Sequence, residues 1–202
     1  MAKAQVVLAT HNQHKIAELR QILAGVLPED QVLGAGDVGA PDVAETGVTF
    51  AENALLKARA AGAHSGRIAI ADDSGLAVDV LGGAPGVFSA RWSGRHGDDA
   101  ANLRLLLAQL ADVPIEHRQA QFVCAAALVA PDGTEVVEHG YLAGTLLTEP
   151  RGSGGFGYDP ILVPHGYERS CAELTPEEKN EISHRGQAFR ALTGHLERLA
   201  QK

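Results

Sequence analysis

The 202-residue chain has little cysteine, few aromatic residues and no long hydrophobic run. Its two cysteines, Cys124 and Cys171, lie far apart without metal-ligand spacing, which argues against a disulfide scaffold or a zinc site. Cys124 lies in the apolar run FVCAAALV, where a small core residue is expected. No segment approaches the length of a membrane span, and the N-terminal apolar stretch is too short for a signal peptide. We therefore expect a cytoplasmic protein without a membrane partner.

Positive charge is also scarce. The chain has 17 Lys and Arg residues against 25 Asp and Glu residues, a formal net charge of −8. General nucleic-acid binders and binders of anionic membranes depend on net positive surfaces, so we expect neither partner. A local basic pocket for one phosphorylated small molecule is compatible with this balance. The length and the 45% apolar composition favour one globular domain over residues 1–202, built from two lobes.

Hydrophobic periodicity predicts an α/β fold. A β-branched run at 5–10 predicts a strand, and apolar residues at helical spacing predict a helix directly after it. Further strands are expected at 31–36, 67–73, 75–81, 120–130 and 134–147, the last two joined as an antiparallel hairpin. Further helices are expected after the capping residues Thr49, Thr175 and Ser183, and at 98–110. An opening βα unit followed by a hairpin indicates a mixed sheet with helices on its faces.

Polar residues gather between the first predicted strand and its helix, in THNQHK, Thr10 to Lys15. Unpaired backbone N–H groups at a helix start suit phosphate oxygens, and Thr10, Asn12 and Lys15 add donors and one mobile charge. The stretch lacks the glycines of a Walker A loop or a GxGxxG fingerprint. Two interpretations remain open: a phosphate-binding turn, or a helix cap beside a solvated lysine.

Asp72 and Asp73 are adjacent carboxylates where an apolar strand is predicted to end. Neighbouring carboxylates repel unless a cation or donor lies between them. Mg²⁺ prefers oxygen ligands, so an ion between Asp72 or Asp73 and Glu45 would turn this repulsion into attraction. The alternative is a polar turn over 72–75 in which one aspartate caps nearby amides. The flanking apolar runs favour the functional interpretation.

Glu45 precedes the helix that Thr49 and Glu52 are expected to cap. Asn53 and Lys57 lie four residues apart, hence on one face of that helix. An isolated Glu45 in a loop would be solvated unless another carboxylate faces it, and Lys57 is also compatible with an ordinary surface lysine.

The glycine-rich stretch GSGGFGYDP, Gly152 to Pro160, carries Phe156, Tyr158 and Asp159. Glycines allow close backbone approach and positive φ, and aromatic side chains on such a loop can stack against a nucleobase. The alternative is a flexible surface loop, although such loops seldom carry two aromatic residues and an Asp-Pro. Three basic residues near the start of the last predicted helix are candidates for holding a phosphate or a purine carbonyl: Lys179, His184 and Arg185.

The chain resembles the inosine triphosphate pyrophosphatase family, above all its bacterial branch. The resemblance runs from about Val6 to Leu192 and is carried by THNQHKIAEL, ETGVTFAENALLKA, ADDSGLAVDVLGGAPGVFSAR, GSGGFGYDPI and AELTPEEKNEISHRGQA. It implies a two-lobed α/β fold with an elongated mixed sheet, an active cleft between the lobes and a homodimer. It also implies Mg²⁺-dependent hydrolysis of ITP, dITP and XTP (deoxy-XTP too) to the monophosphate and pyrophosphate, which clears deaminated purines from the nucleotide pool.

The resemblance also implies roles for individual residues. Glu45 and Asp73 would hold Mg²⁺, and Asp73 would accept a proton from the attacking water. Residues expected to contact the substrate phosphates are Thr10, His11, Asn12, Gln13, His14 and Lys15, with Ser74 as a further substrate contact. Residues expected to hold the base are Phe156, Gly157, Tyr158, Asp159, Lys179, His184 and Arg185.

Two other functions remain open at this point. One is a related pyrophosphatase that acts on pyrimidine or modified nucleotides, since similar folds host different substrates. The other is a nucleotide-binding module without turnover, against which the intact acidic pair argues.

Overall fold

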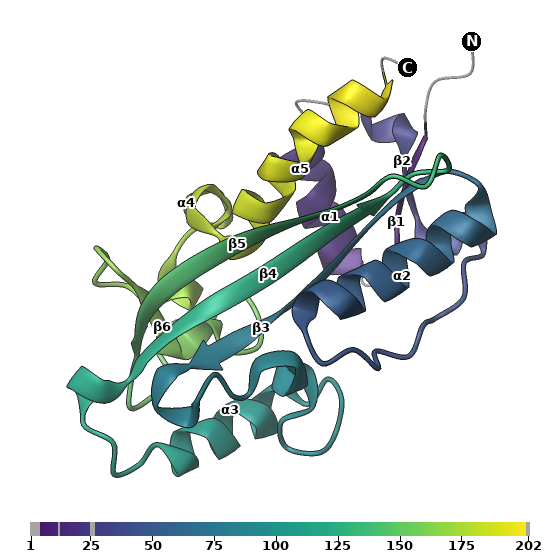
Figure 1. The fold of residues 1–202 in the computed structure, drawn as a ribbon. Coiled ribbons are helices and arrows are strands. Elements are labelled where there is room, and N and C mark those ends of the chain that lie inside the picture. Colours follow the sequence, from purple (N-terminus) through teal and green to yellow (C-terminus); the bar gives the residue numbers. More distant parts are fainter. Residues whose placement is uncertain (1–4, 12, 25–26, 201–202) are drawn as a thin grey trace. The chain divides into compact units, whose positions relative to one another are not determined.

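The computed structural model describes residues 5–11, 13–24 and 27–200. Within these residues lies a sheet with the strand order β2-β1-β3-β4-β5-β6, flanked by helices (Figure 1). Its strands are β1 Val6–Leu8, β2 Val32–Gly34, β3 Ile68–Val78, β4 Gln119–Val129, β5 Glu135–Leu146 and β6 Leu162–Pro164. The α-helices are α1 Gln13–Leu23, α2 Phe50–Ser65, α3 Asp99–Gln109, α4 Pro176–Ile182 and α5 His184–Ala200. The predicted α/β class is confirmed.

The sheet is mixed because its two edges pair differently. Strand β1 is parallel to both of its neighbours, and Val6 lies opposite Val32 of β2 and Ile68 of β3. At the other edge β6 is antiparallel to β5, with Gly144 opposite Pro164. The sequence analysis missed β6, since three residues ending in proline carry no strand periodicity. The turn at 131–133 joins the neighbouring strands β4 and β5, as predicted.

Strand β3 is longer than the sequence analysis predicted. Two separate extended pieces, 67–73 and 75–81, were expected, but β3 runs without interruption from Ile68 to Val78 and includes Asp72, Asp73 and Ser74, so the alternative of a polar turn over 72–75 is excluded. Its pairing with β1 ends at Ile70, whose carbonyl accepts from Ala9 N–H at 2.7 Å. The prediction that the strand ends at these carboxylates is therefore wrong, and it is the neighbouring strand β1 that ends before them.

The chain divides into two compact units. Unit 1 consists of the described residues within Met1–Asp73, Cys124–Gly140 and Arg185–Lys202, and unit 2 consists of Ser74–Val123 and Tyr141–His184. The active cleft that the family resemblance implied between two lobes stays a prediction. In the described part of the chain, no helix combines the length and apolar character needed to cross a membrane.

Unit 1 has a separate apolar cluster on each face of its strands, because neighbouring strand residues point to opposite faces. One face packs against α1 and α5 and includes Leu8, Ile70, Cys124, Leu128, Leu19 and Phe189. The opposite face packs against α2 mostly through alanines, which allow a close approach: Ala54, Ala58, Ala61, Ala69, Ala71, Ala125 and Ala127. The prediction that Cys124 is a core residue is confirmed.

Helix starts were predicted well because capping depends on near neighbours in the sequence. Thr49 accepts from Glu52 N–H at 3.1 Å at the start of α2, and Thr175 accepts from Glu178 N–H at 3.2 Å at the start of α4. In both cases the glutamate completes a capping box. Helix α5 begins at His184, directly after Ser183 as expected.

Unit 2 contains a buried arginine that the sequence analysis did not single out. Arg118 is 2% exposed, and its guanidinium donates to the carbonyls of Leu110, Val113 and Leu147. These carbonyls lie in the segment after α3 and in the segment after β5. One side chain therefore satisfies three backbone acceptors and fastens these two segments together.

We expect Arg118→Lys to lower the free energy of unfolding by about 2–4 kcal/mol, since one ammonium cannot reach three separated carbonyls and each buried carbonyl left without a donor costs about 1–3 kcal/mol. Urea denaturation followed by circular dichroism measures the change. Arg104→Lys, at an exposed position of α3, is the control and should stay within about 0.5 kcal/mol of wild type. Equal losses in the two variants would contradict this role of Arg118.

Candidate active site

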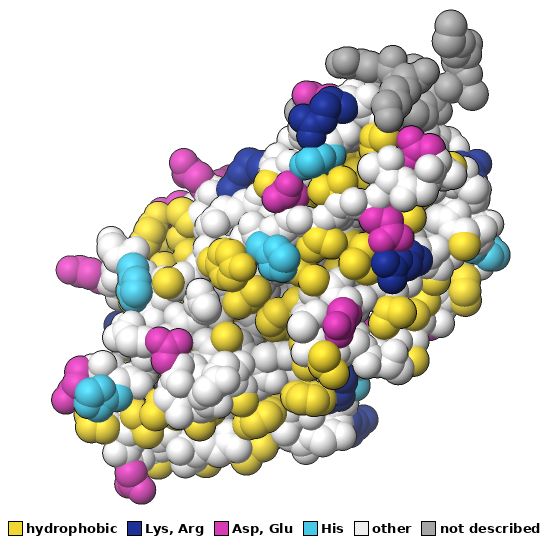
Figure 2. All heavy atoms as spheres, in the orientation of Figure 1, with side chains coloured by type: hydrophobic (Ala, Val, Ile, Leu, Met, Phe, Trp, Pro, Cys, Tyr) yellow, Lys and Arg dark blue, Asp and Glu magenta, His cyan; other side chains and the backbone are white. Residues whose placement is uncertain are grey.

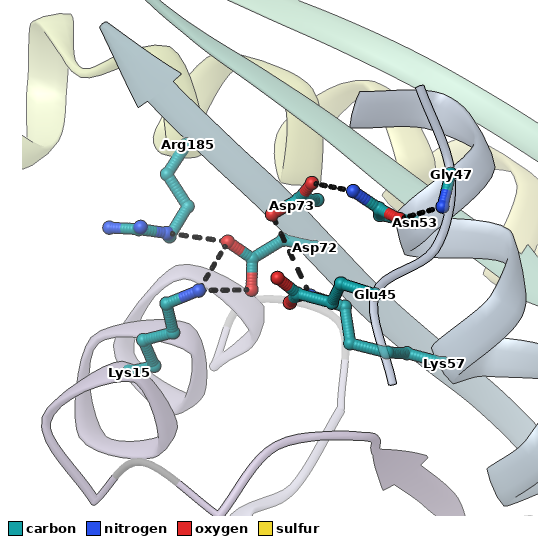
Figure 3. A network of polar contacts seen from close by, with 8 residues as sticks. All are labelled: Lys15, Glu45, Gly47, Asn53, Lys57, Asp72, Asp73 and Arg185. Carbon is teal, nitrogen blue, oxygen red and sulfur yellow. Dashed lines mark hydrogen bonds and ion pairs between the residues drawn. The ribbon is translucent and has the colours of Figure 1, made fainter. Parts of the chain in front are cut away.

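Asp72 and Asp73 lie on opposite faces of β3. Ile70 belongs to the apolar cluster under α1 and α5, and Ala71 belongs to the cluster under α2. Because side chains alternate along a strand, Asp72 continues the Ile70 face and Asp73 continues the Ala71 face. Figure 3 shows the two carboxylates directed toward different partners. The like-charge repulsion expected from their adjacency in the sequence is reduced by this geometry.

Asp72 is held by two cations. Lys15 Nζ, from the first turn of α1, lies 3.3 and 3.1 Å from its two carboxylate oxygens. Arg185 Nε, from the first turn of α5, lies 3.2 Å from Asp72 Oδ2. The side chains of Asp72 and Arg185 are 2% and 4% exposed, so this is a buried charge cluster with one acidic and two basic members. Both basic side chains are donors that an anionic group can also use.

Asp73 lies in a different environment, together with Glu45 and two residues of α2. Lys57 Nζ is 2.7 Å from Glu45 Oε1 and 3.8 Å from Asp73 Oδ1, so one ammonium lies against both carboxylates (Figure 3). Asn53 Nδ2 donates to Asp73 Oδ2 at 2.9 Å. Glu45 and Asp73 thus share the ammonium of Lys57, and the Mg²⁺ expected between these carboxylates stays a prediction.

Burial and neighbouring charges shift the pKa values of Asp73 and Lys57. Burial raises the pKa of Asp73 above its ordinary value, with a smaller contribution from Glu45 and Asp72, and these effects outweigh the opposing ones of Lys57 and Asn53. For Lys57, burial lowers the pKa, but the carboxylates of Asp72, Asp73 and Glu45 together raise it above its ordinary value. Lys57 therefore stays protonated at neutral pH, and Asp73 is a stronger base than an exposed aspartate.

The donor set around Asp73 fits a metal ion that takes few protein ligands. Among the described residues, no group of three or more His, Cys, Asp and Glu side chains is arranged to hold a metal. Mg²⁺, however, is commonly bound by one or two carboxylates together with substrate phosphates and water. Glu45 and Asp73 lie close enough together to contact the same ammonium group, that of Lys57. Their carboxylates therefore offer negative charge and oxygen donors at one place, as such an ion requires.

The predicted phosphate turn follows β1. Thr10 and His11 lie between β1 and α1, Gln13 and His14 open α1, and Asn12 lies outside the described residues. Within this stretch the structure brings Lys15 to the acidic pair, through Asp72. His11 Nε2 instead lies 3.3 Å from Asp42 Oδ1 at an exposed site.

In unit 2 the glycine-rich loop presents an aromatic ring beside an ion pair. Lys179 Nζ lies 2.6 Å from Asp159 Oδ2 and 5.2 Å from the centroid of the Phe156 ring, which is half exposed. The same Asp159 oxygen accepts from Phe156 N–H at 2.7 Å. Asp99, the first residue of α3, accepts from Gly157 N–H at 3.0 Å. The loop is thus held at several points.

Close backbone contacts explain the glycines of this loop. Gly152 has φ = 81°, and a Cβ there would lie 2.7 Å from the backbone of Ala172. A Cβ on Gly155 would collide with the Asp159 carboxylate. Tyr158 is buried and donates its hydroxyl to Ser89 O at 2.9 Å, so only one of the two aromatic side chains of the loop is presented outward.

The three basic residues near α5 have different partners. Lys179 pairs with Asp159 and Arg185 with Asp72, whereas the His184 ring stacks on Phe122 with centroids 5.0 Å apart. His184 and Arg185 are both buried. Ser74 follows Asp73 in β3 and is half buried.

Sequence reasoning did not include Asn53 and Lys57 among the site residues, although both contact Asp73. The signal was their spacing of four residues on the helix that follows Glu45, because this spacing places both side chains on one helical face. A lysine on a helix surface is so common that spacing alone did not decide its role.

Charged side chains of both signs are mixed on the surface. On the face drawn in Figure 2, Lys and Arg side chains of the described residues lie scattered among Asp and Glu side chains.

Comparison with known proteins identifies the family. The model of the Ham1 family matches residues 6–195. The chain belongs to the Ham1 family. A dITP/XTP pyrophosphatase from Streptomyces coelicolor is 66% identical to this Ham1-family chain over 189 residues, covering 93% of this chain and 94% of that protein.

Solved structures agree with this assignment. A HAM1 protein from Coxiella burnetii has a TM-score of 0.88 at 41% identity, covering 96% of this chain and 99% of that one. A nucleoside-triphosphatase, dITP/XTP pyrophosphatase, from Mycobacterium abscessus has a TM-score of 0.77 at 53% identity, covering 93% and 98%. The family resemblance inferred from the sequence motifs and the mixed-sheet fold of this Ham1-family chain are confirmed.

We expect Asp72→Asn to leave Lys15 and Arg185 without their shared negative charge and to lower the free energy of unfolding by about 2–4 kcal/mol, discounted because Lys15 is partly exposed. Pyrophosphate should then raise the melting temperature of this variant more than that of wild type, because an anion replaces the lost charge. Differential scanning calorimetry measures both effects, with exposed Asp79→Asn as the control. Equal stabilisation of variant and wild type by pyrophosphate would argue against an anion site at these cations.

Proposed function

We propose that this protein hydrolyses dITP, ITP, dXTP and XTP to the nucleoside monophosphate and pyrophosphate. Relatives that cover nearly the whole chain carry the name dITP/XTP pyrophosphatase, among them one that is 66% identical. The observation that carries the proposal is the pair Glu45 and Asp73 around one cation, at 2.7 and 3.8 Å from Lys57 Nζ. A carboxylate pair next to cations is what hydrolysis of a metal-bound polyphosphate requires.

In this proposal Asp73 is the proton acceptor. A water oxygen forms a bond to one phosphorus of the α–β phosphoanhydride, and the bond from that phosphorus to the bridging oxygen breaks, so that the bridging oxygen leaves with the other phosphate as an oxyanion. One proton of the water passes to Asp73 and the other stays on the new phosphate hydroxyl. The pKa of Asp73 is raised mainly by burial, which makes its carboxylate a better base than an exposed aspartate. Lys57, lying between the carboxylates, holds them close together.

Glu45 and Asp73 are the residues we propose for holding Mg²⁺. When bound, Mg²⁺ neutralises charge on the triphosphate. The protein supplies the two carboxylates from separate segments: Glu45 lies before α2, and Asp73 lies in β3.

For the phosphates we propose the turn from Thr10 to Lys15, which includes His11, Asn12, Gln13 and His14, with Ser74 as a further contact. The contact of Lys15 with Asp72 supports this assignment, because phosphate can replace part of the bond between these two side chains.

For the base we propose the glycine-rich loop with Phe156, Gly157, Tyr158 and Asp159, together with Lys179, His184 and Arg185. The half-exposed ring of Phe156 supports a stacking role. A 6-keto purine accepts hydrogen bonds, whereas the 6-amino group of adenine donates, so donor side chains disfavour ATP by up to about 10⁴-fold. The homodimer and the cytoplasmic location implied by the resemblance stay predictions.

We expect purified protein to release pyrophosphate from ITP, dITP and XTP in the presence of Mg²⁺, and to turn over ATP at least about 10²-fold less efficiently, since the 6-amino group leaves donors unpaired. Ion chromatography of the products over a panel of purine, pyrimidine and methylated nucleotides, with and without EDTA, measures this. Preference for a pyrimidine or a modified nucleotide would reject the purine assignment. Binding of ITP without turnover would indicate a binding module.

We expect Asp73→Asn to lower kcat for ITP by roughly 10²–10⁴-fold, because the amide cannot accept the proton, while the fold persists. Initial rates at saturating Mg²⁺ together with a thermal melt measure both. The control is Asp79→Asn, which changes an exposed aspartate six residues further along the chain. Near-wild-type turnover by Asp73→Asn would remove Asp73 from the mechanism.

A further inference from the structure

Asn53 occupies a fully buried position between Asp73 and the segment that carries Glu45. It is 0% exposed and is the fourth residue of α2. Its Oδ1 accepts from Gly47 N–H at 2.8 Å, and its Nδ2 donates to Asp73 Oδ2 at 2.9 Å (Figure 3). Gly47 lies two residues after Glu45, so one amide side chain connects the two proposed carboxylates.

The chemistry of these contacts fixes the orientation of the amide. A backbone N–H can only donate, so the oxygen of the Asn53 side chain must face Gly47 and its NH₂ group must face Asp73. Asp73 Oδ2 therefore acts as the acceptor in this contact. The other oxygen, Oδ1, lies on the side of Lys57.

The close approach of the Glu45 segment to Asn53 depends on glycine. A Cβ at Gly47 would lie 2.7 Å from Asn53 Oδ1 and 2.7 Å from Glu52 Cβ, which is closer than such atoms can approach. The next residue, Val48, donates its N–H to Glu52 Oε2 at 2.7 Å. The segment after Glu45 is thus fastened to the first turn of α2 at consecutive residues.

Unit 2 contains a buried asparagine in a similar arrangement, but its side chain has no carboxylate among the partners given below. Asn102 is 1% exposed and is the fourth residue of α3; its Oδ1 accepts from Ser93 N–H at 2.7 Å. Its Nδ2, however, donates to the backbone carbonyl of Ala90 at 3.1 Å. Both asparagines fasten a preceding segment to a helix, and they differ in that the NH₂ group of Asn53 is directed at Asp73.

We propose that Asn53 is a positioning residue for the hydrolysis: it holds the Asp73 carboxylate in place and fastens the Glu45 segment to the same carboxylate. This inference rests on the proposed function. Asn53 itself touches no reacting atom in this account. Its effect is therefore expected in kcat rather than in KM, since KM reports substrate contacts that Asn53 does not make.

Three variants separate this role from a merely structural one. Asn53→Asp keeps the oxygen that accepts from Gly47 N–H and loses the donor to Asp73, whereas Asn53→Ala loses both. Asn102→Ala is the matched control, because it removes the same side chain from the same position of another helix. Kinetics with ITP and Mg²⁺, thermal melts, and amide hydrogen exchange at Gly47 in the substrate-free protein are measured for each.

We expect kcat to fall roughly 10–100-fold in both Asn53 variants with KM within about threefold of wild type, as for a mispositioned catalytic group. Asn102→Ala should lower the melting temperature by a few degrees, much like Asn53→Ala, and keep the wild-type kcat. The Gly47 amide should stay protected in Asn53→Asp and exchange faster in Asn53→Ala.

Wild-type kcat in Asn53→Asp would overturn the inference while the proposed function stands. An equal loss of kcat in Asn102→Ala would overturn it as well, because a general loss of stability would then explain both. If Asn53→Asp does not fold, the comparison of Asn53→Ala with Asn102→Ala decides alone. A wild-type protein without turnover of ITP would overturn the proposed function, and this inference with it.

Discussion

The site depends on the alternation of side chains along β3. Two adjacent aspartates in a turn would compete for the same cations, but in an extended strand they face opposite sides of the sheet. Asp72 then meets Lys15 and Arg185, while Asp73 meets Asn53 and Lys57. Because β1 ends at Leu8, opposite Ile70, the carboxylates lie just beyond the paired region of the two strands. The neighbouring elements α1, α2 and α5 supply the basic residues that allow this charge to be buried.

The two carboxylates differ in the basic side chains that contact them. Around Asp72 two cations share one carboxylate, whereas around Asp73 one ammonium, from Lys57, lies against two carboxylates. The first arrangement favours an anion and the second favours a cation. A metal-bound triphosphate carries both negative and positive charge. Residues 72 and 73 are adjacent in β3, yet one contacts groups that suit an anion and the other contacts groups that suit a cation. This agrees with the activity named for relatives of the Ham1 family.

The sequence allowed the prediction of features that depend on near neighbours. Thr49 with Glu52 and Thr175 with Glu178 are local patterns, and both capping boxes are present. The extent of β3 was not predictable in this way, because Asp72 to Gly75 resembles a turn. The neighbouring strand β4 and the partners of Asp72, which lie 57 and 113 residues away along the chain, are features of the tertiary structure. Lys57 was missed for the same reason: its burial follows from the position of β3 beside α2.

The comparison of Asn53 with Asn102 shows that a local sequence pattern does not distinguish a site residue from a structural one. Each is the fourth residue of a capped helix, each is buried, and each accepts from the backbone of a preceding segment. What separates them is the acceptor for the NH₂ group: Ala90 O lies in the same preceding region as Ser93, whereas Asp73 comes from a strand that follows the helix. The NH₂ group of Asn102 has a backbone carbonyl as its acceptor, whereas that of Asn53 has the carboxylate of a proposed site residue. The glycine at position 47 has its own local cause, since a Cβ there would lie 2.7 Å from Asn53 Oδ1 and from Glu52 Cβ.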